Sequence, residues 1–381
     1  MRNTKKSLLL PILLLTGAVA QSCRAQVTTE NVKSQTNVFL DGTLNATQRM
    51  SAQRASHTAT LLNNGKVLIG GGFVGEENIL ASAEIFDPQT NGFLRAENMR
   101  VQRSSHTATL LPNGKVLIAG GFNGNYLDSA EIYDSATGKF TSTPKMTMAR
   151  SGHVAVLLNN GKVLLAGGIG TDWTFLNSAE IYDPASNTFT QTGAMTTPRE
   201  SHTLTLLKDG RVLITGGHQG RRTAITIYSS CEIYNPSNGT LALAGNLIVK
   251  RHKHDAVLLA DGRVLIVGGS DERDGAGAYR NAEIYNPTNK TFAAVSNMNA
   301  SRYKLQGTAV LLKNGKVLIA GGANRAEVFD PTNHTFSFAS GDMGTIRLFA
   351  TATLLQNGRV LIVGGYDDRM AVSSNAWIYK V

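Results

Sequence analysis

The chain has 381 residues, with 39 glycines, two cysteines, 17% charged residues and a formal net charge of +10. This composition excludes a disulfide framework and is typical of an all-β protein rich in turns. The positive charge favours anionic partners over cationic ones, without identifying the anion.

The first residues have the pattern of an export signal. Basic residues precede an apolar stretch over residues 7–17, and the small residues Ala18 and Ala20 offer a cleavage point. Such a stretch is too short to span a bilayer comfortably and is typical of a secretory signal. We therefore expect a signal peptide over residues 1–22, cleaved after residue 20 or 22, and a linker over residues 23–36.

A second interpretation of this region depends on Cys23. A cysteine just after an apolar stretch resembles a bacterial lipoprotein signal, in which the cysteine is acylated and becomes the new N-terminus. Gln21 is unusual at its place before such a cysteine. Two locations stay open: a lipoprotein of the cell surface or outer membrane attached at Cys23, or a periplasmic or secreted protein. The lipid would be the one attachment to a membrane.

Beyond residue 37 the chain repeats with a period of about 50 residues. Each repeat opens with an apolar run, such as residues 57–62, which leads into an Asn-Gly or Asp-Gly pair. These pairs tolerate the positive φ of tight hairpins, so each predicts a turn between two strands. The seven pairs end at Gly65, Gly114, Gly161, Gly210, Gly262, Gly315 and Gly358.

The rest of each repeat predicts three more strands. The second strand ends in Gly-Gly, the third reads like Ala179–Pro184, and the fourth carries an aromatic or Leu residue. Four short antiparallel strands cannot bury both faces alone, so the repeats should stack around an axis. The Gly-Gly pair, the aromatic strand after it and the period resemble the kelch repeat family over residues 37–381. This resemblance implies an all-β, seven-bladed β-propeller with four antiparallel strands per blade.

The two ends of the repeat region complement each other. The last repeat stops after its third strand, Ala376–Tyr379, whereas residues 37–40 resemble a fourth strand without a repeat of their own. Met50 follows this segment as other methionines follow the other fourth strands. We therefore expect the N-terminal segment to complete the last blade.

One arginine recurs where the chain enters each blade. In kelch proteins an Arg at this place often lines the central pocket, so the resemblance implies a ring that binds acidic ligands. The alternative is structural, because a residue present in every repeat usually stabilises the repeat, and six third strands carry a Glu that would pair with it. The arginines are Arg54, Arg103, Arg150, Arg199, Arg251, Arg302 and Arg347. Five are followed by a His, which we interpret as neutral and bonded to neighbouring backbone: His57, His106, His153, His202 and His254.

Residues that differ between blades are the better functional candidates, because the fold does not require them. The loops between second and third strands carry aromatic and charged side chains that suit carbohydrate or peptide recognition. These loops and the connectors between blades should share one face, which we call the upper face. The candidate ligand-binding residues in the loops are Trp173, Arg221, Arg222, Tyr279 and Tyr366.

No catalytic set, metal cluster or phosphate loop can be argued from spacing, so we expect no cofactor, no metal and no nucleic-acid partner. Some kelch propellers are copper radical oxidases that need Tyr and His ligands and a Cys–Tyr crosslink. Cys231 stands at a small core position of a third strand. We therefore predict an exported, non-catalytic propeller that recognises an anionic glycan or a protein segment on the upper face. The alternative is a carbohydrate-active enzyme, galactose oxidase-like or sialic acid mutarotase-like, although that mutarotase family has six blades.

Overall fold

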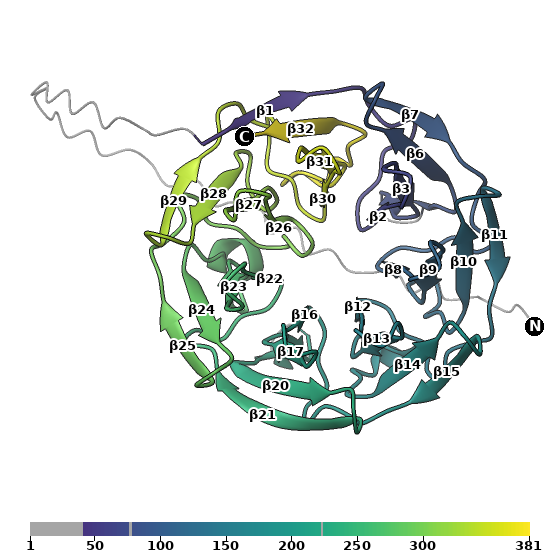
Figure 1. Ribbon diagram of the computed structural model, residues 1–381, viewed down its shortest axis with the longest axis horizontal. Helices are drawn as coiled ribbons and strands as arrows, with labels where there is room; N and C mark the ends of the chain where they lie inside the picture. Colours follow the sequence, from purple (N-terminus) through teal and green to yellow (C-terminus); the bar gives the residue numbers. More distant parts are fainter. Residues whose placement is uncertain (1–40, 76–77, 222–223) are drawn as a thin grey trace, which may run out of the picture. The chain divides into compact units, whose positions relative to one another are not determined.

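The computed structural model describes residues 41–75, 78–221 and 224–381. The expected signal peptide, Cys23, the linker, residues 37–40 and Arg222 lie outside the described residues. Within the body Val38–Val381, seven four-stranded antiparallel sheets surround an axis (Figure 1). Each innermost strand contacts the innermost strands of both neighbouring sheets, so the ring is closed. None of the described helical segments is long and apolar enough to cross a membrane.

The sheets form the seven blades of a β-propeller, numbered here in chain order, with strands given from the axis outwards. Blades 1 to 4 are β2 (Thr58–Leu61), β3 (Val67–Gly70), β6 (Ala83–Asp87), β7 (Gly92–Arg95); β8 (Thr107–Leu110), β9 (Val116–Ala119), β10 (Ala130–Asp134), β11 (Lys139–Ser142); β12 (Val154–Leu157), β13 (Val163–Ala166), β14 (Ala179–Asp183), β15 (Thr188–Gln191); and β16 (Thr203–Leu206), β17 (Val212–Thr215), β20 (Ser230–Asn235), β21 (Thr240–Asn246). Blades 5 to 7 are β22 (Asp255–Leu258), β23 (Val264–Val267), β24 (Ala282–Asn286), β25 (Thr291–Ala294); β26 (Ala309–Leu311), β27 (Val317–Ile319), β28 (Glu327–Asp330), β29 (Thr335–Phe338); and β30 (Thr351–Leu354), β31 (Val360–Val363), β32 (Ala376–Lys380), β1 (Thr43–Ala46).

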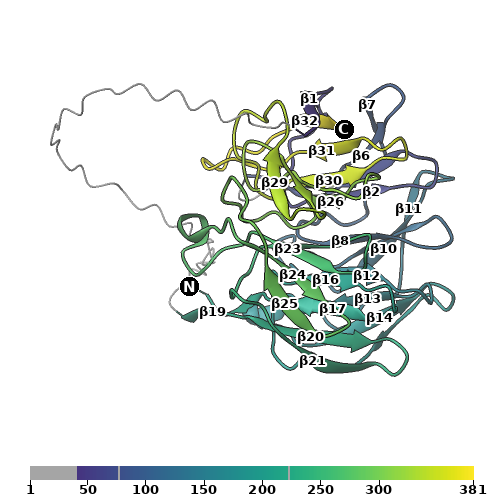
Figure 2. The ribbon, with the colours of Figure 1, turned by 60° about the vertical axis from the view of Figure 1, so that its left-hand side comes forward.

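The hydrophobic core lies between blades. Second strands such as β13 are buried along their whole length, because a neighbouring blade covers each of their faces. Leu117 of β9 packs with Leu165 of β13 and Tyr182 of β14, and equivalent clusters recur around the ring. The outer strands β21 and β25 follow the rim of the body, as Figure 2 shows. A blade therefore has no core of its own and depends on its two neighbours.

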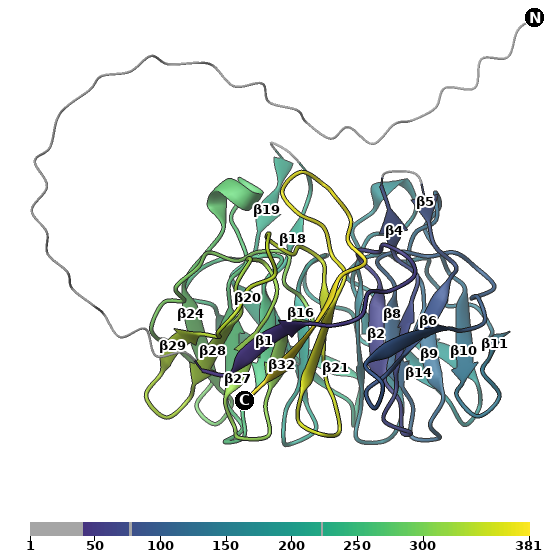
Figure 3. The same cartoon turned by 90° about the horizontal axis from the view of Figure 1, so that it is seen from above.

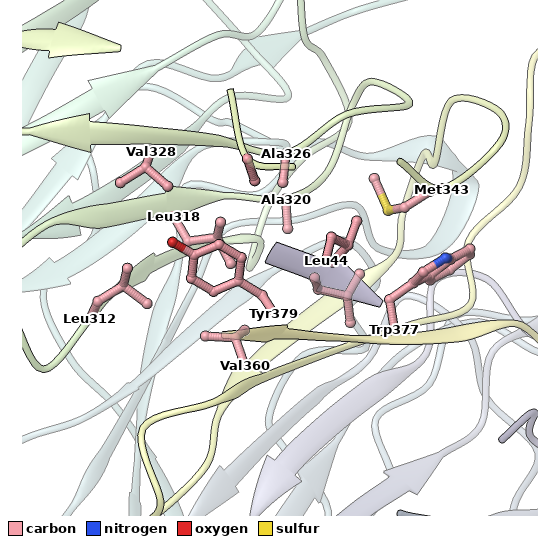
Figure 4. Close-up of a cluster of buried hydrophobic side chains, with 12 residues drawn as sticks. Leu44, Leu312, Leu318, Ala320, Ala326, Val328, Met343, Val360, Trp377 and Tyr379 are labelled. Atoms are coloured by element: carbon pink, nitrogen blue, oxygen red, sulfur yellow. The ribbon is translucent and has the colours of Figure 1, made fainter. Parts of the chain in front are cut away.

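The predicted closure of the last blade is confirmed, but its strand lies later than residues 37–40. β1 pairs antiparallel with β32, with Thr43 opposite Lys380 and Ala46 opposite Trp377. Leu44 packs against Trp377 in the core between blades 6 and 7 (Figure 4). The spacing to the methionine explains the shift: β7 and β11 end four residues before their methionines, and Ala46 precedes Met50 by the same distance.

The Gly-Gly pairs allow the backbone of a connector between blades to pass close to the end of a second strand. Gly72 has a φ of +92°, and a Cβ there would lie 2.6 Å from the carbonyl oxygen of Ala55. A side chain would displace the connector, so glycine is required.

The second-to-third-strand loops all rise on one side of the ring, the predicted upper face (Figure 3). They include two small hairpins and two turns of 3-10 helix. These are β4–β5 (Phe73–Val74 and Asn78–Ile79), β18–β19 (His218–Gln219 and Thr226–Ile227), η1 (Thr171–Trp173) and η3 (Asp274–Gly277).

Candidate functional site

Six of the seven recurrent arginines are buried in ion pairs within their own blades. Arg150 is fully buried, and its Nη2 lies 2.8 Å from Oε1 of Glu180 on the third strand. Its Nη1 donates to the carbonyl oxygens of Gly167 and Ser178, while Glu180 also accepts the backbone N–H of Thr147. The same arrangement recurs in Arg54–Glu84, Arg103–Glu131, Arg150–Glu180, Arg199–Glu232, Arg251–Glu283 and Arg302–Glu327.

Arg347 departs from this pattern because blade 7 has Trp377 where the other third strands have Glu. Its guanidinium carbon lies 5.2 Å from the centre of the Trp377 ring, and it is also buried. None of the seven guanidinium groups is placed on an open surface of the mouth. The geometry supports the structural interpretation of the ring, in which each Arg fixes a connector to its blade.

Four of the five recurrent histidines join neighbouring blades through side-chain hydroxyl groups, whereas both ring nitrogens of His202 are buried without a hydrogen-bond partner among the described residues. Nε2 of His106 lies 3.1 Å from Oγ1 of Thr58 in the preceding blade, and His57 makes the same contact with Thr351 across the ring closure. Burial, reinforced by Arg54, lowers the pKa of His57 to about 3, so this imidazole is neutral. The partners of these four histidines are threonine side chains and not the expected backbone groups.

The residue two positions after each recurrent Arg lies in a ring of backbone segments around the mouth of the upper face, which we call the mouth ring. At each position φ lies in the left-handed region. Six hydrogen bonds of 2.9–3.2 Å run from one blade's N–H to the preceding blade's carbonyl; the contact between Ser201 and Gly152 lacks one. The mouth ring consists of Ser56, Ser105, Gly152, Ser201, Lys253, Lys304 and Phe349.

Blades 4 to 7 contribute a compact group of ionisable side chains to the mouth. Oδ1 of Asp274 lies 2.5 Å from Nζ of Lys253 and 3.5 Å from Nε2 of His252. Burial alone would raise the pKa of Asp274, but the hydrogen bond from His252 and the charge of Lys253 outweigh it and lower the pKa. Asp274 and Lys253 therefore form a charged pair beside a neutral imidazole.

Lys304 is the cation of the mouth ring that has no carboxylate partner in the described part of the chain. Its Nζ donates a hydrogen bond of 2.8 Å to Oη of Tyr366. The same Nζ lies 5.3, 5.5 and 5.4 Å from the ring centres of Tyr303, Phe349 and Tyr366. Burial lowers the pKa of Lys304, which means that its charge is poorly solvated.

A carboxyl group and two imidazoles form a second part of the mouth. Oε2 of Glu200 lies 3.6 Å from Nε2 of His218, whose Nδ1 is 3.0 Å from Nδ1 of His252. Burial raises the pKa of Glu200 to about 7, against the opposing charges of Arg221 and Lys253. Burial lowers the pKa of His218 to about 3.

The predicted loop residues are distributed over several blades. Trp173 is 43% exposed, and the guanidinium carbon of Arg221 lies 3.6 Å from its ring centre. Tyr126 packs edge-on against Trp173 with ring centres 5.8 Å apart, so the two rings form an aromatic platform on which Arg221 stacks. Tyr366 is buried beside Lys304, whereas Tyr279 is partly buried 5.7 Å from the Arg251 guanidinium.

Sequence reasoning missed Glu200, His252, Lys253 and Lys304 as site residues. They stand one or two positions after a recurrent Arg, whose regular recurrence makes it the more prominent signal in the sequence. A usable signal is present: the position after the Arg reads Ala, Ser, Ser, Glu, His, Tyr and Leu through the seven blades. Departure from the repeat at a fixed position therefore indicates the site better than recurrence does.

Family models match this repeat pattern. The model of the KLHDC2/KLHL20/DRC7 Kelch-repeats domain matches residues 139–322, and the Kelch motif model matches residues 103–147. The chain is a kelch-repeat β-propeller. No curated protein matches it. A solved structure described as a novel fungal alcohol oxidase with catalytic diversity among the AA5 family, in complex with copper, is similar to this kelch propeller with a TM-score of 0.73 and 17% identity. The match covers 89% of this chain and 76% of that chain, and it shows the shared fold alone.

The described residues of this kelch propeller do not fit a copper centre built from Tyr, His and a crosslinked Cys. They contain no group of three or more His, Cys, Asp or Glu side chains that could hold a metal ion. Cys231 is fully buried in the core of blade 4 beside Leu213 and Ile233, and burial raises the pKa of its thiol to about 12. This cysteine is a core residue.

Proposed function

We propose that this kelch propeller binds an anionic glycan or an acidic protein segment across the mouth of its upper face. The observation that carries the proposal is Lys304, a partly buried ammonium that has aromatic rings around it and no carboxylate partner among the described residues. A poorly solvated cation gains most from a ligand anion that approaches it directly. A kelch propeller fits such a binding role, and binding of this kind requires no catalytic residues.

The surroundings of Lys304 support an extended ligand. In the loops of blades 3 and 4, Trp173 and Arg221 present an aromatic ring and a second cation. Rings of this kind bury the apolar faces of sugars or peptide side chains, while the cations select an acidic group. The export signal that we expect over residues 1–22 adds the proposal that the binding takes place outside the cytoplasm, at the cell surface or in a secreted or periplasmic form.

Replacement of Lys304 by Met should weaken binding of the acidic ligand by roughly tenfold or more, since a hydrogen bond to a charged group contributes about 1.5–3 kcal/mol. The measurement is binding of the purified protein to arrays of neutral, carboxylated and sulfated glycans and of acidic peptides. Both ligand classes are acidic, and the array identifies the one that is bound.

The matched control is Lys313→Met, which removes the same charge from a hairpin tip of blade 6 on the opposite face. The control should bind as the unmodified protein does. Equal binding by the Lys304 variant, or a preference for neutral ligands, would show that the mouth is not an anion site.

A further inference from the structure

The series of polar contacts from Asp274 to Glu200, with hydrogen bonds at its centre, indicates which nitrogen of each imidazole carries its proton. Nε2 of His252 faces two acceptors, Oδ1 of Asp274 at 3.5 Å and the carbonyl oxygen of Asp271 at 3.2 Å, so this nitrogen is protonated. Burial lowers the pKa of His252, so the ring is neutral and its Nδ1 is an acceptor. His218 must then donate from its own Nδ1 across the 3.0 Å contact.

This assignment leaves Nε2 of His218 without a proton, pointing to Oε2 of Glu200 at 3.6 Å. Two unprotonated acceptors repel each other, whereas a protonated Glu200 would donate to the nitrogen. The side chain of Glu200 is only 24% exposed, and its carboxyl group also lies against Gly152 of the neighbouring blade. The geometry therefore favours a neutral carboxylic acid at this place.

The groups that face Glu200 come from blades 2 to 5. They are His218 and Arg221 from the loop of blade 4, Lys253 from the connector into blade 5, Tyr126 from the loop of blade 2, and Gly152 from the connector into blade 3. Burial raises the pKa of the Glu200 carboxyl group to about 7, although the positive charges of Arg221 and Lys253 lower it. The proton can therefore be gained or lost near neutral pH.

The protonation of Glu200 changes the charge that the mouth offers to a ligand. Asp274 and Lys253 cancel, and both imidazoles are neutral. Asp274 also acts on Lys304 through space, but it is already paired with Lys253, so Lys304 and Arg221 leave this group of side chains with a net positive charge when Glu200 is protonated. An ionised Glu200 lowers that net charge by one. Anion binding and proton uptake must therefore favour each other, because coupling between two sites is reciprocal.

We infer that the mouth is a proton-coupled carboxylate site, in which the ligand's carboxylate lies at Lys304 and Glu200 takes up one proton from water as the ligand binds. This inference rests on the proposed function for the position of the ligand. No covalent bond is made or broken, and the proton returns to solvent when the ligand leaves.

The test uses sodium D-glucuronate as the probe and D-glucose as its uncharged control. We expect the affinity for glucuronate to fall by roughly tenfold between pH 6 and pH 8.5, within the range of coupling between two sites. Calorimetry at pH 7.5 in two buffers of different ionisation enthalpy should show net proton uptake. Glu200→Gln should bind equally well at both pH values and take up no proton. Glu272→Gln, an exposed change of the same charge on the same face, should keep the pH dependence.

The outcomes separate the two proposals. Binding of glucuronate with the same affinity at both pH values overturns the coupling and leaves the binding function intact. A fall in affinity that persists in Glu200→Gln assigns the effect to deprotonation of the lysines and also overturns it. An NMR titration of the Glu200 carboxyl carbon with a midpoint below pH 5 would overturn the proton coupling without any ligand. Absence of binding to glucuronate and to all acidic array ligands overturns the binding function itself.

Discussion

Removal of strand β1 by deletion of residues 41–46 should lower the melting temperature of the propeller by roughly 5 °C or more, as expected for a loss of several kcal/mol. The strand supplies the whole outer edge of blade 7, and its loss leaves the partners of β32 unpaired. It also exposes Trp377 and Tyr379, which pack against Leu44 between blades 6 and 7 (Figure 4). Thermal unfolding followed by circular dichroism measures the effect.

A pair of point variants tests the same closure without a deletion. Leu44→Asp places a charge in the buried cluster and should destabilise strongly, whereas Asn45→Asp changes an exposed position of the same strand. Asn45→Asp should have the same melting temperature as the unmodified protein. If Leu44→Asp also had this melting temperature, β1 would contribute nothing to the stability of the ring.

Replacement of Glu180 by Ala should cost about 3–5 kcal/mol of unfolding free energy, because it leaves the buried guanidinium of Arg150 without its counter-ion. Urea unfolding measures the loss. The control is Asp183→Ala, which breaks a partly exposed pair with Lys162 in the same blade and should cost no more than about 1 kcal/mol.

A double variant separates the charge from the packing. Arg150→Met combined with Glu180→Leu removes both charges together, and should recover much of the loss because no unpaired ion remains in the core. If Glu180→Ala were as stable as the unmodified protein, the Arg150 guanidinium would be solvated, and the arginines would return as candidates for ligand binding.

The sequence predicted the seven blades because their signals are local and repeated. Each Asn-Gly or Asp-Gly pair specifies a hairpin by its own backbone preference, and each Gly-Gly pair marks a close approach such as that at Gly72. The closing strand was placed several residues early because it has no repeat of its own, and only the distance from Met50 reveals its position.

The site was harder to predict because it depends on which repeated residues are buried. Arg150 and Glu180 are 30 residues apart in sequence, and the spacing does not show that their side chains meet inside the blade. Glu200, Lys253 and Lys304 come from three different blades, and only the closed ring brings them to one mouth. The hairpin loops vary between blades, but the positions beside the recurrent Arg vary too, and these lie at the mouth ring.

The mouth ring separates the scaffold of this propeller from its specificity. Six of its seven junctions are main-chain hydrogen bonds, so these junctions do not depend on the side chains at the ring positions. The left-handed backbone would suit glycine best, and other residues cost roughly 1 kcal/mol each there. Gly152 is nevertheless the one glycine among the seven positions. At the six other positions, evolution or protein engineering can change the side chains that contact a ligand while the fold stays the same.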